Sequence, residues 1–62
     1  MPIIRVTWFA GRTKEQKAEL AKAITEAVVR IGKTSADHTT IVFEDTAKED
    51  WASSGVLASD KQ

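Results

Sequence analysis

The sequence contains no cysteine, one histidine and one proline, and only three of its 62 residues are glycine. The lack of cysteine excludes a disulfide framework, which leaves association with other subunits as the usual support for so short a chain. A chain of this length buries only about 60% of its unfolded surface, so a lone monomer would be marginally stable. We therefore expect a single domain, spanning residues 1–62, that works as an oligomer.

An excess of charge of one sign is also missing, because nine Lys and Arg residues balance nine Asp and Glu residues. Without a basic run, nucleic acid and anionic membrane surfaces are not expected as partners. The uncharged stretches are far shorter than the roughly 18 residues of a membrane span, and no secretory leader pattern is present. We expect a cytoplasmic protein, which the absence of cysteine is compatible with.

A strand is predicted from Pro2 to Phe9, where β-branched and aromatic residues predominate. Successive side chains of a strand point to opposite faces, and both faces of this one are largely apolar. One face consists of Ile4, Val6 and Trp8, and the other of Ile3, Arg5, Thr7 and Phe9. We expect the first face to be covered by a helix and the second to be buried between subunits.

A helix is predicted from Lys14 to about Ile31, after a break in the pattern at Ala10-Gly11-Arg12. Thr13 followed by Gln16 matches a capping box, and Gly32 stands where a left-handed C-cap is favoured. Apolar residues recur at steps of three and four and form one stripe of the helix. The members of this stripe are Leu20, Ala21, Ile24, Ala27, Val28 and Ile31.

A second strand is predicted from Thr39 to Glu44, after a polar connection. Strand, helix and strand make a β-α-β unit, so the fold class is α/β, with parallel strands and a right-handed crossover. The tail after Trp51 contains small residues and then Val56-Leu57-Ala58. It predicts a turn with a short strand or hairpin that pairs with a neighbouring subunit.

Pro2 is the residue that points to chemistry. A small residue after an initiator methionine normally allows that methionine to be removed, which would leave proline as the N-terminus with a secondary amine. Ordinary α-amino groups have a pKa near roughly 7.7–8.0, and desolvation or a nearby cation lowers the pKa of an amine. Such a proline can act as a general base at cellular pH without any histidine. Retention of Met1 would instead make the Pro2 nitrogen a tertiary amide with no usable basicity.

Several short segments occur together at one spacing and resemble the 4-oxalocrotonate tautomerase family of the tautomerase superfamily. They are Pro2-Ile3-Ile4, Gly11-Arg12-Thr13 with Glu15-Gln16-Lys17, Glu26-Ala27, Ala47-Lys48, and Gly55 with Leu57-Ala58-Ser59. The resemblance implies a β-α-β protomer, active sites at subunit contacts, and a homohexamer arranged as a trimer of dimers. It also implies no metal and no other cofactor.

The resemblance assigns roles to four residues. Pro2 matches the catalytic proline, a general base that moves a proton in a small unsaturated 2-hydroxy or 2-oxo carboxylate. Arg12 matches the arginine that holds a substrate carboxylate, which a guanidinium beside a helix start can do well. Trp51 matches an aromatic residue that walls the pocket. Thr40 stands where archetypal members carry a second arginine, so a dicarboxylate substrate would lack one positive contact.

Two alternatives remain open at this level. A hydratase, dehalogenase or decarboxylase of the same superfamily would need an additional carboxylate to activate water, for which Glu44, Asp45 and Glu49 are available. A non-catalytic subunit of a hetero-oligomer is the other, motivated by Thr40. Arg5 could supply a substitute charge, although an edge or interface role is the simpler interpretation. His38 and Lys33 are interpreted as loop residues.

Overall fold

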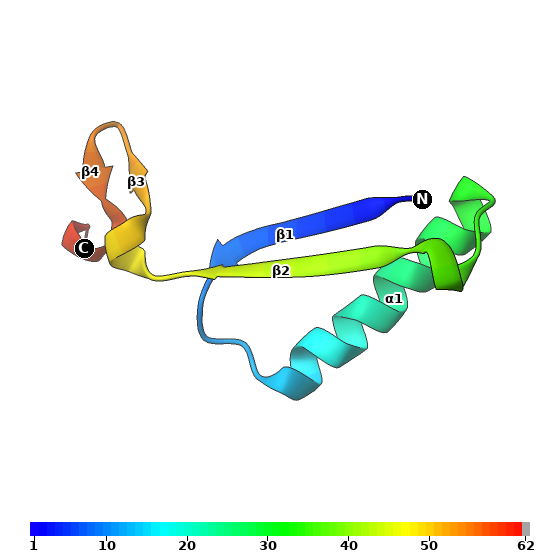
Figure 1. Ribbon diagram of the computed structural model, residues 1–62. Coiled ribbons are helices and arrows are strands. Elements are labelled where there is room, and N and C mark those ends of the chain that lie inside the picture. Colours follow the sequence, from blue (N-terminus) through cyan, green and yellow to red (C-terminus); the bar gives the residue numbers. More distant parts are fainter. Residues whose placement is uncertain (62) are drawn as a thin grey trace.

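Two parallel strands and one long helix form the body of the computed structural model, which describes residues 1–61 (Figure 1). Gln62, the last residue of the expected domain, lies outside the described residues. The main elements are β1 (Ile3–Phe9), α1 (Lys14–Gly32), β2 (Thr40–Thr46), β3 (Ala52–Ser53) and β4 (Val56–Leu57). Two short 3-10 helices, η1 (Ala36–His38) and η2 (Lys48–Asp50), lie between these elements, and a third, η3 (Ala58–Asp60), follows β4. Within residues 1–61, no helix has the length and apolar character that crossing a membrane requires.

The pairing of β1 with β2 is parallel, as the β-α-β prediction requires, and it runs from Ile3 beside Thr40 to Phe9 beside Thr46. The second strand starts one residue later and ends two residues later than predicted. It continues past Glu44 because Asp45 and Thr46 stay in register with the end of β1. The Ala10 amide donates to the Thr46 carbonyl at 3.0 Å and closes this end of the sheet.

The face of β1 that is predicted to contact the helix is more buried than the opposite face. Ile4, Val6 and Trp8 are half-buried, whereas Ile3, Arg5 and Thr7 are exposed. An ion pair between Lys17 of α1 and Asp45, the register partner of Trp8, shows that the half-buried face is the one that α1 covers. The prediction that one face of the strand packs against a helix is therefore confirmed.

The capping box at the start of α1 is present in full. The Gln16 amide donates to Thr13 Oγ1 at 3.1 Å, and the Thr13 amide donates to Gln16 Oε1 at 2.9 Å. The predicted cap at Gly32 is wrong by one residue, because α1 includes Gly32 and the left-handed residue is Lys33, with φ 58°. Ile31, predicted on the apolar stripe, is 68% exposed because it lies in the last turn, where no described residue covers it.

The tail forms the predicted hairpin, in which β3 and β4 pair antiparallel. Ser54 and Gly55 make its two-residue turn with φ of 53° and 78°. Two successive positive φ values are the geometry of a type I′ turn, which matches the twist of a hairpin and favours glycine. The hairpin projects beyond one end of the β1–β2 sheet, away from the N-terminus (Figure 1).

The protomer is extended, and none of its described residues is buried. Its radius of gyration is 14.8 Å and its dimensions are 42 × 24 × 14 Å, whereas a compact chain of this length has a radius near 11 Å. Large apolar side chains lie open on it, among them Ile3 at 58% exposure and Val56 at 42%. Because burial of apolar surface is the main source of stability, these side chains favour a folded state in which other subunits cover them.

We predict that folding and association are coupled. Tenfold dilution is expected to lower the thermal unfolding midpoint by roughly 4 °C or more, because mass action then favours the dissociated chain. Circular dichroism over a hundredfold range of protein concentration measures this shift. A midpoint that does not change with concentration would contradict the prediction.

Candidate active site

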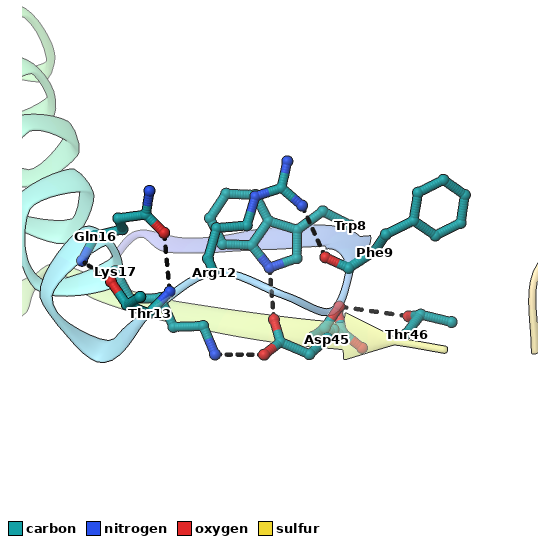
Figure 2. Close-up of polar contacts among 9 residues, drawn as sticks. Trp8, Phe9, Arg12, Thr13, Gln16, Lys17, Asp45 and Thr46 are labelled. Carbon is teal, nitrogen blue, oxygen red and sulfur yellow. Dashed lines mark hydrogen bonds and ion pairs between the residues drawn. The ribbon is translucent and has the colours of Figure 1, made fainter. Parts of the chain in front are cut away.

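Arg12 lies in the loop between β1 and α1, where the chain turns sharply at Gly11. Gly11 has φ 134°, a backbone conformation that side chains with a Cβ rarely adopt. The turn brings the Arg12 side chain back over the end of β1 (Figure 2). Arg12 Nη1 donates to the Phe9 carbonyl oxygen at 2.7 Å, and its Cζ lies 4.4 Å from the centroid of the Trp8 ring. These two contacts hold the guanidinium over the Trp8 ring at the end of β1.

Trp8 is itself held on two sides. Its ring stacks on Phe43 of β2 with centroids 5.3 Å apart and planes inclined by 17°. Its Nε1 donates to Asp45 Oδ1 at 2.6 Å, and Lys17 of α1 pairs with the other oxygen of the same carboxylate (Figure 2). The hydrogen bond from Lys17, followed by that from Trp8, lowers the pKa of Asp45 from its ordinary value. Asp45 is therefore ionised at neutral pH.

The charges at this end of the sheet leave a positive site. Lys17 neutralises Asp45, so the three groups Arg12, Lys17 and Asp45 carry a net charge of about +1. A guanidinium has five N–H donors, and the contact with Phe9 uses one of them. The start of α1 follows directly and adds the positive end of the helix dipole. This arrangement suits a bidentate contact with a carboxylate.

Pro2 and Thr40 lie side by side at the opposite end of the sheet. The Thr40 amide donates to the Pro2 carbonyl oxygen at 3.0 Å, and Thr40 is the register partner of Ile3. From Pro2 to Phe9 an extended strand covers roughly 23 Å. Arg12 bonds to Phe9, at the other end of β1 from Pro2. Pro2 and Arg12 therefore lie far apart within one protomer.

Trp51 belongs to the Arg12 end. It follows η2, is half-buried, and its ring lies 4.8 Å from that of Phe9 at an angle of 57°. The four predicted site residues thus form two groups, Pro2 with Thr40 and Arg12 with Trp51. Arg12 and Trp51 both contact Phe9, Arg12 through the Phe9 carbonyl and Trp51 through the ring, and the structure does not bring the two groups together in one chain.

The remaining candidates have other contacts. Arg5 pairs with Glu44 at 3.8 Å on the sheet face away from α1, and Thr7 Oγ1 donates to the same carboxylate at 3.2 Å. The Arg5 side chain is 66% exposed and is directed along the strand toward Glu44, not toward Thr40. Lys33 and His38 lie exposed in the connection before β2, as interpreted from the sequence. No three metal-ligating side chains gather within residues 1–61.

Sequence reasoning missed the contacts of Trp8 and Lys17 with Asp45. The sequence places Trp8 only on an apolar face, and the predicted second strand ends one residue before Asp45. A parallel register with a longer second strand would have placed Asp45 beside Trp8.

Comparison with known proteins gives a consistent result. The family described as "Tautomerase enzyme" has a model that matches residues 2–61. A "Probable tautomerase" of Ralstonia nicotianae is 37% identical over 57 residues, which cover 92% of this chain and 88% of the relative. Among solved structures, the 4-oxalocrotonate tautomerase homologue YwhB superposes with a TM-score of 0.92 and 33% identity, over 98% of this chain and all of that one. The present chain also superposes on a heterohexamer 4-oxalocrotonate tautomerase from Chloroflexus aurantiacus with a TM-score of 0.87 and 26% identity, and the alignment covers both chains in full.

We predict that Asp45 contributes to the acid sensitivity of the fold. Its pKa is lowered in the folded state, so its stabilising contribution is full above its unfolded pKa of about 3.9 and is lost as the pH falls through the folded pKa. Denaturant unfolding midpoints measured from about pH 6 to pH 2 should therefore fall less steeply in an Asp45→Asn variant than in the parent. Identical pH dependence in the two proteins would rule out this role.

Proposed function

Because the chain belongs to the 4-oxalocrotonate tautomerase family of the tautomerase superfamily, we propose that it is a single-domain enol–keto tautomerase. Its substrate is a small unsaturated 2-hydroxy or 2-oxo carboxylate, Pro2 is the general base and Arg12 is the carboxylate anchor. The observation that carries the proposal is the Arg12 guanidinium, which Trp8 and the Phe9 carbonyl hold at the start of α1 beside a neutralised Asp45. The reaction needs no cofactor, since proton transfer is its only chemical step.

The proton transfer requires a free amine at Pro2, so removal of Met1 is part of the proposal. Met1 is 90% exposed in the protomer, where a peptidase can reach it. The Pro2 nitrogen then takes the proton of the enol hydroxyl as the O–H bond breaks and the carbonyl forms. The electrons of the enol double bond shift, and the protonated proline returns the proton to carbon as a new C–H bond. Desolvation in a covered pocket lowers the pKa of the amine and keeps it available as a base.

The site is shared between subunits. Pro2 and Arg12 are separated by roughly 23 Å of strand within one protomer, which is too far for both to contact one small substrate. The anchor of one subunit must therefore serve the proline of another. The open apolar side chains of Ile3, Val56 and Leu57 supply surface for such contacts. A homohexamer arranged as a trimer of dimers, in the cytoplasm, is the assembly that we propose.

Thr40 and Trp51 determine the charge and the polarity of the surface that contacts the rest of the substrate. Thr40 lies beside Pro2 through its backbone amide and its side chain is neutral, so the end of the substrate near the proline finds no cation from residue 40. A monocarboxylate is therefore the preferred substrate over a dicarboxylate. Trp51 belongs to the Arg12 end through its contact with Phe9, and it supplies the apolar wall that excludes water from the anchored carboxylate.

The water-activating reactions of the superfamily receive less support. Glu44 is engaged by Arg5 and Thr7, and Asp45 by Lys17 and Trp8. Both carboxylates are therefore already paired within the chain and are less available to activate water, while Glu49, the third candidate, lies exposed in η2.

A subunit role in a hetero-oligomer is the second candidate. Two observations favour it: the neutral Thr40 beside Pro2, and the heterohexameric state named for the Chloroflexus aurantiacus relative. Turnover that appears only after mixing with a second homologous chain would select this candidate over the homohexamer.

We predict that Pro2→Ala lowers kcat for phenylenolpyruvate by about 10²-fold, because the primary amine that alanine leaves is no longer held by a ring and is therefore misplaced as a base. Ketonisation followed by ultraviolet absorbance measures the loss, in proteins whose intact mass shows that Met1 is absent. A Pro2→Ala protein as active as the parent would remove the mechanism.

We predict that Thr40→Arg shifts specificity toward dicarboxylates. The added cation next to Pro2 is expected to raise kcat/KM for 2-hydroxymuconate by roughly tenfold or more, since one preorganised donor contributes at least that much. The monocarboxylate phenylenolpyruvate is the internal control and should change little. An equal change for both substrates would mean that residue 40 does not contact the second carboxylate.

A further inference from the structure

We propose that Trp8 is a positioning residue for Arg12, and that the Asp45–Lys17 pair holds Trp8 in place without taking the charge of Arg12. The inference rests on the proposed role of Arg12 as the carboxylate anchor. It adds three residues that never touch the substrate but determine where its carboxylate binds.

An arginine side chain on a loop has many rotamers, and each must be excluded before a bidentate contact becomes precise. Here two contacts to consecutive residues of β1 restrict it: Nη1 bonds to the Phe9 carbonyl at 2.7 Å, and Cζ lies 4.4 Å above the Trp8 ring. The hydrogen bond fixes one nitrogen, and the ring limits the plane of the guanidinium. The N–H groups that remain are then presented to an incoming carboxylate in a defined orientation.

The ring that supports Arg12 is fixed as well. Trp8 stacks on Phe43 across the sheet and donates its only polar hydrogen to Asp45 at 2.6 Å. The stacking limits tilting of the ring, and the hydrogen bond distinguishes the indole from its flipped rotamer. A phenylalanine at this position would keep the flat apolar face and lose the bond to Asp45, whereas a leucine would lose both.

Lys17 neutralises the charge of Asp45. Arg12 lies close enough to Asp45 for its positive charge to help lower the pKa of that carboxyl, and an unpaired carboxylate there would compete with the substrate for the guanidinium. Lys17 pairs with Asp45, and their side chains keep only 29% and 30% exposure. The carboxylate can therefore hold Trp8 while the positive charge of Arg12 stays available.

The first test is a double-mutant cycle between residues 8 and 12. The dissociation constant of cinnamate, an unreactive monocarboxylate, is measured by calorimetry, and KM and kcat by phenylenolpyruvate turnover. We expect Trp8→Leu to raise the dissociation constant and KM about 3- to 30-fold, the range of a lost cation–π contact, with kcat within about threefold. Trp8→Phe should recover most of the affinity. In the Arg12→Ala background, Trp8→Leu should have no further effect.

The second test removes the positive charge of Lys17 and does not depend on whether the Trp8→Leu protein assembles. Lys17→Gln is expected to weaken cinnamate binding several-fold more than Lys14→Gln, which removes the same charge from the same helix start but leaves Asp45 paired. Adding Asp45→Asn to Lys17→Gln should restore part of the lost affinity, since the competing carboxylate is then gone.

The outcomes separate the two proposals. If Arg12→Ala itself leaves cinnamate affinity and KM unchanged, the proposed anchor is wrong. If Arg12→Ala weakens binding but Trp8→Leu does not, or if Trp8→Leu weakens binding equally in the presence and absence of Arg12, then Trp8 is only a packing residue and this inference is overturned. Equal effects of Lys17→Gln and Lys14→Gln would overturn the role of Lys17.

Discussion

The length of β1 is the constraint on which the account depends. A seven-residue strand holds Pro2 at one end and presents the Phe9 carbonyl to Arg12 at the other, and an extended chain cannot be shortened to bring them together. The protomer also leaves all its described side chains at least partly open to solvent. Both facts favour association, which covers apolar surface and so stabilises the fold; in the proposed function it also brings the anchor of one chain to the proline of another.

Much of the fold follows from local chemistry in the sequence. The capping box of Thr13 and Gln16 determines where α1 starts, and the alternation of Ile4, Val6 and Trp8 determines the covered face of β1. The predicted end of the second strand is wrong because a tertiary contact overrides the local signal: the sheet carries β2 beyond Glu44, where β1 still offers partners. The helix end is displaced by one residue, since α1 includes Gly32 and its left-handed C-cap is Lys33.

The layout of the candidate site could not be predicted from the sequence. The resemblance names Pro2, Arg12, Thr40 and Trp51, while only the register of β1 with β2 shows that they divide into two groups. The support of Arg12 was not visible in advance, because Trp8 and Asp45 are 37 residues apart in sequence. A tryptophan on an apolar face is typical of packing, and its proposed positioning role depends on the loop that folds Arg12 over its ring.

Coassembly of two inactive variants tests the shared site most directly. Pro2→Ala and Arg12→Ala chains, each free of Met1, are mixed in equal amounts, unfolded and refolded together, and assayed with phenylenolpyruvate. A site that takes its proline and its arginine from different subunits predicts recovery of about one quarter of the parent's activity, the share of sites that receive both intact residues at random. If the mixture stays as inactive as the separate variants, both residues act within one chain and the account is wrong.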